Sequence, residues 1–159
     1  MRAQFILAAM PLSLSNVLIH VIFSTRDRVP VLNDTIRPEL HAYLAATVRD
    51  VGCECYRAGG VSDHVHLAIR LSRTVTVAEL IKELKACSSK WVKAQSPALA
   101  KFGWQRGYGV FSVGPSDLGA LIRYIDAQEE HHRKVDFKEE FLAFLKKYGV
   151  EFDEEHLWD

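Results

Sequence analysis

The stretch SDHVHLAIR (62–70) alternates its side chains in the manner of a β-strand. Successive side chains of a strand point to opposite faces of the sheet. His64 and His66 therefore share one face, and the apolar residues between and after them share the other. The apolar face predicts a place in a hydrophobic core. The two imidazoles predict either half of a metal site or an ordinary polar sheet face, and the pair alone does not decide between them.

The rest of the chain predicts three further strands and four helices in a regular order. Strands are expected over 17–24 (VLIHVIFS), 53–59 and 108–113, and helices over 35–51, 76–95, 117–133 and 136–149. Thr76 and Glu79 form a capping-box pattern at the start of the second helix. Ser116 is expected to cap the third helix, and Asp136 with Glu139 the fourth.

The order β-α-β-β-α-β, followed by two helices, is that of a ferredoxin-like split βαβ fold. This is an α+β fold with an antiparallel sheet and, here, additional C-terminal helices. Its first and third strands are neighbours in the middle of the sheet. His20, in the first strand, then lies near the histidine pair, where it either supports a ligand histidine or packs as an ordinary core residue. One face of such a sheet lies under helices, and we expect the other to need a partner or a ligand.

Length and composition indicate one soluble globular domain. The chain has 159 residues, of which 48% are hydrophobic and 25% charged. Three cysteines without zinc-ligand spacing favour a reduced protein of the cytoplasm. The formal net charge is zero, yet residues 1–115 carry +6 and residues 116–159 carry −6. The basic part can face a phosphate backbone, or the acidic end can simply be solvated.

The first residues, MRAQFILAAMPLS, are interpreted as an extension of the folded domain. We expect residues 1–13 to be disordered and residues 14–159 to form a single domain. The segment faintly resembles a signal peptide, but no convincing small-residue cleavage site follows. Met10 is the favoured natural start, with residues 1–9 an upstream extension. No apolar run approaches the length of a membrane span, so no membrane partner is expected.

A second group of polar side chains lies in the helix after Ser116. Tyr124 and Gln128 are four residues apart and fall on one helix face. A glutamine oxygen can bind a hard metal ion, and a tyrosine can be a nucleophile, although tyrosine at helical spacing is also common in a core. His131 and His132 are rival ligands, but adjacent histidines near a charged helix end are commonly solvated.

Several cations are candidates for contacts with a nucleic acid. On the helix over 76–95, three lysines fall in one stripe opposite the apolar face: Lys82, Lys85 and Lys93. Such a stripe suits phosphate contacts or, more commonly, an exposed helix surface. The loops add further charge together with aromatic side chains suited to stacking on a single strand: Arg26, Arg28, Trp104, Arg106 and Tyr108.

Taken together, the chain resembles the single-tyrosine HUH transposases of bacterial insertion sequences, which include insertion-sequence 200/605 enzymes and REP-associated tyrosine transposases. The resemblance covers about residues 14–159 in consistent order. It rests on NVLIHVIFSTRDR, SDHVHLAI, FGWQRGYGVFSV and LIRYIDAQEEHHR. Two histidines around one apolar residue are a weak signal alone, but they are specific when Y-x-x-x-Q follows on a helix. Ala68, where a larger residue would be unsurprising, and the extra N-terminus are minor departures.

The resemblance implies a ligand set, a nucleophile and a reaction. His64, His66 and Gln128 would hold a divalent cation, Mg²⁺ or Mn²⁺, and Tyr124 would be the nucleophile. The enzyme would cleave single-stranded DNA at a hairpin-associated site, keep a 5′-phosphotyrosine link and rejoin strands without a nucleotide cofactor. Such enzymes are usually homodimers in which the tyrosine helix often packs against the histidine pair of the other subunit.

Three other functions stay open from the sequence. The chain could be a domesticated relative that serves the host, since the same residues would be present. It could be a non-catalytic binder of single-stranded nucleic acid, because the ferredoxin-like fold hosts many such modules. It could also be a small metal hydrolase for another phosphodiester, in which Tyr124 would be dispensable.

Overall fold

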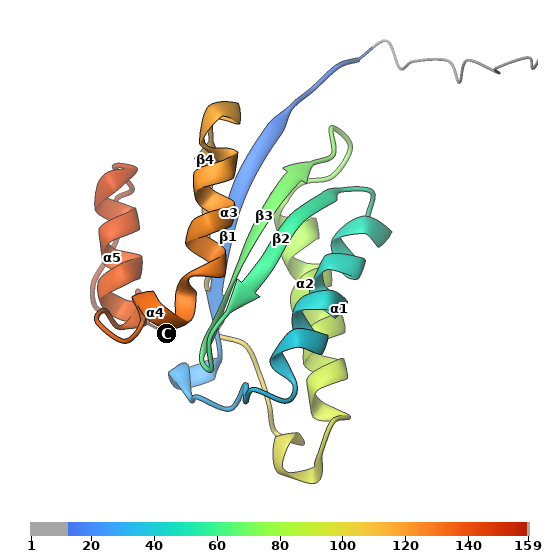
Figure 1. Cartoon of the computed structure of the whole chain (residues 1–159), viewed down its shortest axis with the longest axis vertical. Coiled ribbons are helices and arrows are strands. Elements are labelled where there is room, and N and C mark those ends of the chain that lie inside the picture. The colour runs from blue at the N-terminus through green and yellow to red at the C-terminus, as the bar shows by residue number, and fades with distance from the viewer. Residues whose placement is uncertain (1–12, 159) are drawn as a thin grey trace, which may run out of the picture.

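A computed structural model describes residues 13–158, and in it one four-stranded antiparallel sheet lies between two layers of helices (Figure 1). The strands are β1 (Val17–Ser24), β2 (Glu54–Gly60), β3 (His64–Leu71) and β4 (Gly109–Val113). Their order is β2-β3-β1-β4, so β1 and β3 are the central pair. The predicted ferredoxin-like α+β fold is confirmed. The prediction for residues 1–13 lies, except for Ser13, outside the described residues.

Helices cover both faces of the sheet. One layer consists of α1 (Arg37–Asp50) and α2 (Val77–Lys93). The other consists of α3 (Leu118–Asp126), α4 (Gln128–His131) and α5 (Phe137–Lys147), and Figure 1 shows α3 and α5 on the side opposite α1 and α2. The chain therefore covers the second face itself. The expectation that this face needs a partner or a ligand for cover was wrong, because the C-terminal helices fold back over it.

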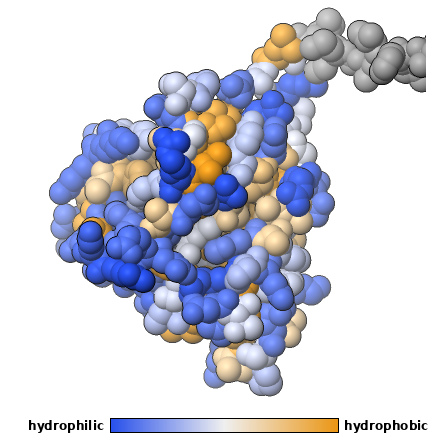
Figure 2. Space-filling view, in the orientation of Figure 1, coloured by the Kyte–Doolittle hydropathy of each residue, from blue (hydrophilic) through white to orange (hydrophobic). Residues whose placement is uncertain are grey.

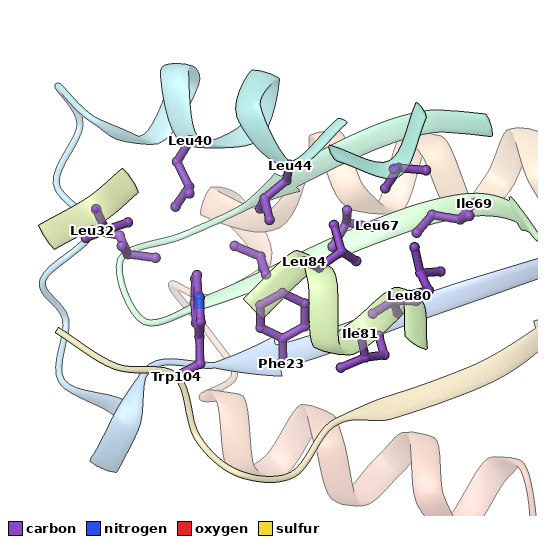
Figure 3. Close-up of a cluster of buried hydrophobic side chains, with 14 of the residues drawn as sticks. Phe23, Leu32, Leu40, Leu44, Leu67, Ile69, Leu80, Ile81, Leu84 and Trp104 are labelled. Carbon is purple, nitrogen blue, oxygen red and sulfur yellow. The ribbon is translucent and has the colours of Figure 1, made fainter. Parts of the chain in front are cut away.

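The larger core lies between the sheet and the layer of α1 and α2. Alternate residues of β1 and β3 point into it and are fully buried or nearly so: Ile19, Val21, Phe23, Val65, Leu67 and Ile69. Figure 3 shows Leu40 and Leu44 of α1, with Leu80 and Leu84 of α2, around these strand residues. Burial of each such side chain contributes about 1.5–3 kcal/mol. This core fixes which residues of β1 and β3 face the other way.

The opposite face of the sheet carries the histidines and a smaller apolar cluster. In the strand register Ile22 pairs with His66, and Ser24 pairs with His64. The apolar stripe of α5 packs on this face through Phe137, Phe141 and Leu145, together with Ile22 and Phe111. Residues at i, i+4 and i+8 lie on one helix face, so α5 presents this stripe to the sheet. The stripe places α5 directly over the histidine pair.

The helix predicted over 117–133 is broken at Ala127. The backbone of Ala127 has φ −93° and ψ 12°, and this residue separates α3 from α4. Gln128 begins α4 and is buried, with 1% of its surface exposed. The predicted cap was also wrong: Ser116 lies in the 3-10 turn Pro115–Asp117, and Asp117 precedes α3 without a side-chain capping bond. The capping box of Thr76 with Glu79 and the cap of Asp136 are present as predicted.

Figure 2 shows a mainly hydrophilic face, with hydrophobic side chains visible between α3 and the strands. None of the helices within residues 13–158 has the length and apolar character that crossing a bilayer requires. Cys53, Cys55 and Cys87 are all free thiols.

Candidate metal and tyrosine site

The two histidines of β3 lie on the sheet face that α3, α4 and α5 cover. His64 begins β3 and His66 follows on the same side of the strand, as the alternation predicted. Neither side chain is exposed, and their ring centroids are 5.1 Å apart. Buried imidazoles need polar partners, because an unpaired polar group inside a protein is costly. The partners of each ring therefore decide what the pair can do.

His64 is oriented by a carboxylate. Its Nδ1 lies 2.6 Å from Asp63 Oδ1, and a carboxylate can only accept, so Nδ1 donates its proton there. In the neutral imidazole, Nε2 then has a free lone pair. It lies 3.3 Å from Gln128 Oε1 and 3.5 Å from Glu140 Oε1, both of which are also acceptors. A carboxylate behind a histidine in this way is the arrangement that supports metal-ligating imidazoles. Asp63 was missed in the sequence although it adjoins the motif.

His66 has a similar arrangement. Its Nδ1 lies 2.8 Å from Nε2 of His20, the neighbour that the strand pairing predicted. Its Nε2 lies 3.0 Å from Glu140 Oε1, yet within residues 13–158 neither of these two buried atoms has a hydrogen-bond partner. Burial lowers the pKa of His66 to about 4, and burial together with His66 lowers the pKa of His20. Both rings are therefore neutral at pH 7, and in the tautomer whose Nδ1 donates to His20, His66 offers its Nε2 lone pair toward Glu140.

Gln128 reaches this spot because of the helix break. Its Nε2 donates to the carbonyl oxygen of Tyr124 at 3.3 Å, and this contact fixes the orientation of the amide. Oε1 therefore faces His64 and lies 2.9 Å from His132 Nε2. The structure thus brings Gln128 to the histidines, as the sequence predicted, and it brings His132 with it.

Glu140 of α5 is a second residue that sequence reasoning missed. Its carboxylate is buried, with 3% of the residue exposed, and Oε2 lies 3.0 Å from His131 Nε2 and 3.2 Å from His132 Nε2. Burial alone would raise the pKa of Glu140. Hydrogen bonds from His132 and from the Tyr124 hydroxyl outweigh burial and hold that pKa well below its usual range. One signal was present in the sequence, because Glu140 is an acidic residue within the apolar stripe of α5.

Tyr124 lies beside the same carboxylate. Its hydroxyl donates to Glu140 Oε2, and its ring centroid is 5.7 Å from that of His66. Burial, and then the hydrogen bond and charge of Glu140, raise the pKa of Tyr124, so the phenol is protonated at neutral pH. Two cavities, of about 350 and 540 Å³, adjoin Tyr124 and share Phe144 and Lys147 in their walls. Open space therefore reaches the tyrosine, and the first of these cavities is also lined by Glu140 and His131.

The arrangement fits a divalent cation. Two ligand atoms about 2.1 Å from one ion lie about 3.0 Å apart at a right angle and about 3.4 Å apart at the tetrahedral angle. Here lone-pair atoms of His64, His66, Gln128 and Glu140 have neighbouring separations of 3.0, 3.3 and 3.5 Å. Of these atoms, His66 Nε2 and Glu140 Oε1 have no hydrogen-bond partner within residues 13–158. Imidazole nitrogens with amide and carboxylate oxygens suit a first-row metal or Mg²⁺.

The predicted DNA-contacting cations fall into two groups. Arg26 and Arg106 are exposed near the end of the sheet where β3 begins, and Arg28 lies 5.6 Å from the ring of Trp158. The lysine stripe lies on α2, on the other side of the sheet from the histidines. Its two outer members, Lys82 and Lys93, are exposed.

Lys85 differs from the other lysines of the stripe. Its Nζ donates to the carbonyl oxygens of Gln105, Arg106 and Gly107, at 2.7, 3.1 and 2.8 Å. An ammonium group has three protons, so these contacts use all of them. In this structure Lys85 holds the loop before β4.

Comparison with known proteins places the chain in a family. A family model described as "Transposase IS200 like" matches residues 13–128. A solved structure from Deinococcus radiodurans R1, assigned as a transposase, is 22% identical with a TM-score of 0.59 and covers 74% of this chain and 95% of that one. A REP-associated tyrosine transposase bound to a REP hairpin is 16% identical with a TM-score of 0.58, over 79% of this chain and 73% of that one. No curated protein matches. The two solved structures share the fold, and because the family model spans most of the sequence, the chain belongs to the IS200-like transposases.

Proposed function

We propose that the protein is a metal-dependent transposase that cleaves and rejoins single-stranded DNA, with Tyr124 as its nucleophile. His64, His66 and Gln128 are the proposed metal ligands. The observation that carries the proposal is the convergence of these three side chains and the Tyr124 hydroxyl on one small region of the sheet. Membership in the transposase family supports the reaction class.

The proposed reaction is a displacement at phosphorus. The phenol oxygen of Tyr124 forms a bond to the scissile phosphorus, and the bond from phosphorus to the 3′ oxygen breaks. The phenol loses a proton and the departing 3′ oxygen gains one, so the exchange is neutral overall. The product is a 5′-phosphotyrosine link and a free 3′-OH. The link keeps the phosphodiester energy, so a second 3′-OH can reverse the step and join new strands without ATP.

The chain's own groups prepare this step. Asp63 and His20 keep the Nε2 lone pairs of His64 and His66 directed at one point. A bound Mg²⁺ or Mn²⁺ would polarise the scissile phosphate and stabilise the charge that develops on it. The raised pKa of Tyr124 means that the phenol must lose its proton as it attacks.

We propose a DNA hairpin with an adjoining single strand as the substrate. A relative of the same fold is bound to a REP hairpin, which supports this choice. Arg26, Arg28 and Arg106, at the end of the sheet where β3 begins, are the proposed backbone contacts. The strand to be cut would enter through the cavities beside Tyr124, where Lys147 can contact phosphate and Phe144 can stack. Lys82 and Lys93 lie on the other side of the sheet from the histidines, so they would contact parts of the DNA farther from the cleaved bond.

A cytoplasmic homodimer remains part of the proposal. All the proposed ligands and Tyr124 come from one chain here, so a second subunit is not needed to complete the cluster. Light scattering distinguishes a monomer of 18.0 kDa from a dimer of twice that mass.

A covalent-adduct assay tests the proposed function. Labelled single-stranded DNA carrying the hairpins that flank the gene is mixed with the protein and Mn²⁺, and the products are separated under denaturing conditions. A labelled protein band that requires metal and Tyr124 supports the proposal. Binding to these hairpins without any adduct would favour a non-catalytic nucleic-acid-binding module instead.

A further inference from the structure

We infer that Glu140 of α5 is a further protein ligand of this cation, and that it links the cation to the Tyr124 hydroxyl. The inference rests on the metal site of the proposed function. It adds a carboxylate to a set that the sequence motif supplies only with two imidazoles and an amide. Glu140 also lies beyond residues 13–128, which the family model matches, so the family match does not include it.

One oxygen of the Glu140 carboxylate is buried without a hydrogen-bond partner. Glu140 Oε1 lies 3.0 Å from His66 Nε2 and 3.5 Å from His64 Nε2. It is fully buried, and it has no hydrogen-bond partner within residues 13–158. Leaving a buried charged acceptor unsatisfied is costly, whereas one cation among these three atoms would satisfy all of them.

The two oxygens of the Glu140 carboxylate face different groups. Oε2 accepts from the Tyr124 hydroxyl and lies close to His131 and His132. These contacts hold the carboxylate in one rotamer, and they leave Oε1 alone to face the histidines of β3. One residue thus touches both the nucleophile and the proposed metal ligands.

His132 is the nearest alternative to Glu140 as a metal ligand, and its contacts favour a different role. His132 Nε2 lies 2.9 Å from Gln128 Oε1 and 3.2 Å from Glu140 Oε2. Both neighbours are acceptors within ordinary hydrogen-bond distance, so His132 Nε2 serves best as their donor. His64 Nε2 differs, because its oxygen neighbours lie farther away, at 3.3 and 3.5 Å, and its Nδ1 already donates to Asp63. His132 therefore orients the two oxygen ligands. A carboxylate is also a better ligand for Mg²⁺ and Mn²⁺ than an imidazole, because hard cations prefer charged oxygen.

Direct measurement of Mn²⁺ binding tests the inference without relying on activity. Free Mn²⁺ is followed by electron paramagnetic resonance during titration of the full-length protein. Glu140→Gln keeps the size of the side chain and an acceptor for Tyr124, but it removes the charge. We expect its dissociation constant for Mn²⁺ to rise at least about tenfold. Glu139→Gln is the matched control, since Glu139 is the exposed neighbour on the same helix, and it should stay within about twofold of wild type.

Unchanged Mn²⁺ affinity in Glu140→Gln would overturn the inference and leave Glu140 as an anchor for α5. So would a wild-type protein that binds no Mn²⁺. If Glu140→Gln does not fold, Glu140→Asp replaces it. This variant keeps the charge but moves the carboxylate away from the histidines by one methylene. Wild-type Mn²⁺ affinity in Glu140→Asp would also overturn the inference.

The adduct assay separates the two proposals. Affinity that depends on Glu140 without any adduct would refute only the proposed reaction, and an adduct with affinity independent of Glu140 would refute only this inference.

Discussion

A methyl group added at Gly59 should displace the tyrosine helix from the sheet. Gly59 pairs with His66 in the sheet and lies beneath α3. A Cβ at this position would lie 2.6 Å from Ile125 Cγ2 and 3.3 Å from the Ile125 carbonyl oxygen. Ile125 is buried and precedes Asp126 at the end of α3, so neither a rotamer change nor a backbone shift is cheap.

The size of the effect follows from these distances. Ordinary contact of a Cβ begins at 3.4 Å, so Gly59→Ala requires α3 to retreat by about 1 Å. Overpacking of this kind costs about 1–3 kcal/mol, and the smaller chain entropy of alanine in the unfolded state returns about 0.4–1 kcal/mol. We expect a net loss of about 1–2 kcal/mol in the free energy of unfolding. Tyr124 is adjacent to Ile125, and a misplacement of about 1 Å can slow a reaction about 100-fold.

Urea unfolding and the rate of DNA adduct formation measure the two effects. Gly107→Ala is the control, because within the described residues a Cβ there would meet nothing within 4 Å. The control should stay within about 0.5 kcal/mol of wild type and form adduct at the same rate. If Gly59→Ala matched wild type in both stability and rate, the close packing of α3 on β2 would be refuted.

Three further predictions concern Asp63, Lys85 and His41. Asp63→Asn should weaken Mn²⁺ binding about 10–100-fold in a metal titration, because it removes the carboxylate that orients His64. Lys85→Met should lower the free energy of unfolding in urea by about 2–3 kcal/mol, because three carbonyl oxygens lose their donor. Burial, then Arg37, lowers the pKa of His41 to about 4 in the folded protein, so the unfolded chain binds the proton first as pH falls below about 6.5. Between pH 7 and pH 4 wild type should therefore lose up to about 3 kcal/mol more stability than His41→Gln.

Each of these has a contradicting result. Wild-type Mn²⁺ affinity in Asp63→Asn would mean that Asp63 does not support the site. A Lys85→Met protein as stable as wild type would mean that the loop before β4 is held by other contacts. Parallel stability curves for wild type and His41→Gln across the pH range would mean that His41 titrates normally in the fold.

The fold was largely predictable because local patterns and topology agreed. The apolar run of β1, the alternation in β3, the capping box at Thr76 and the order of elements were enough to place the histidine strand beside β1. The cover of the second sheet face was not predictable, because the apolar stripe of α5 does not say which surface it will meet. The break at Ala127 was also missed, since the sequence has no glycine or proline there to signal it.

The candidate site was predictable only where its residues lie in one motif or on one helix. The histidine pair and the spacing of Tyr124 and Gln128 fall in this class. Glu140 does not, because it comes from a helix that reaches the site through tertiary packing 16 residues beyond Tyr124. An acidic residue within an apolar stripe was its one local sign. Lys85 shows the opposite case: its spacing predicted an exposed stripe, but a nearby loop offered its ammonium three carbonyl oxygens.

One gel can decide whether Tyr124 attacks DNA at a site built on His64 and His66. Wild type, Tyr124→Phe, His64→Ala and the control Tyr43→Phe, in α1 on the other side of the sheet, are each incubated with labelled hairpin-flanked single strands, with and without Mn²⁺. We predict a covalent protein–DNA band with Mn²⁺ in wild type and Tyr43→Phe, and no band in the other two variants or without metal. A band that persists in Tyr124→Phe would contradict the claim.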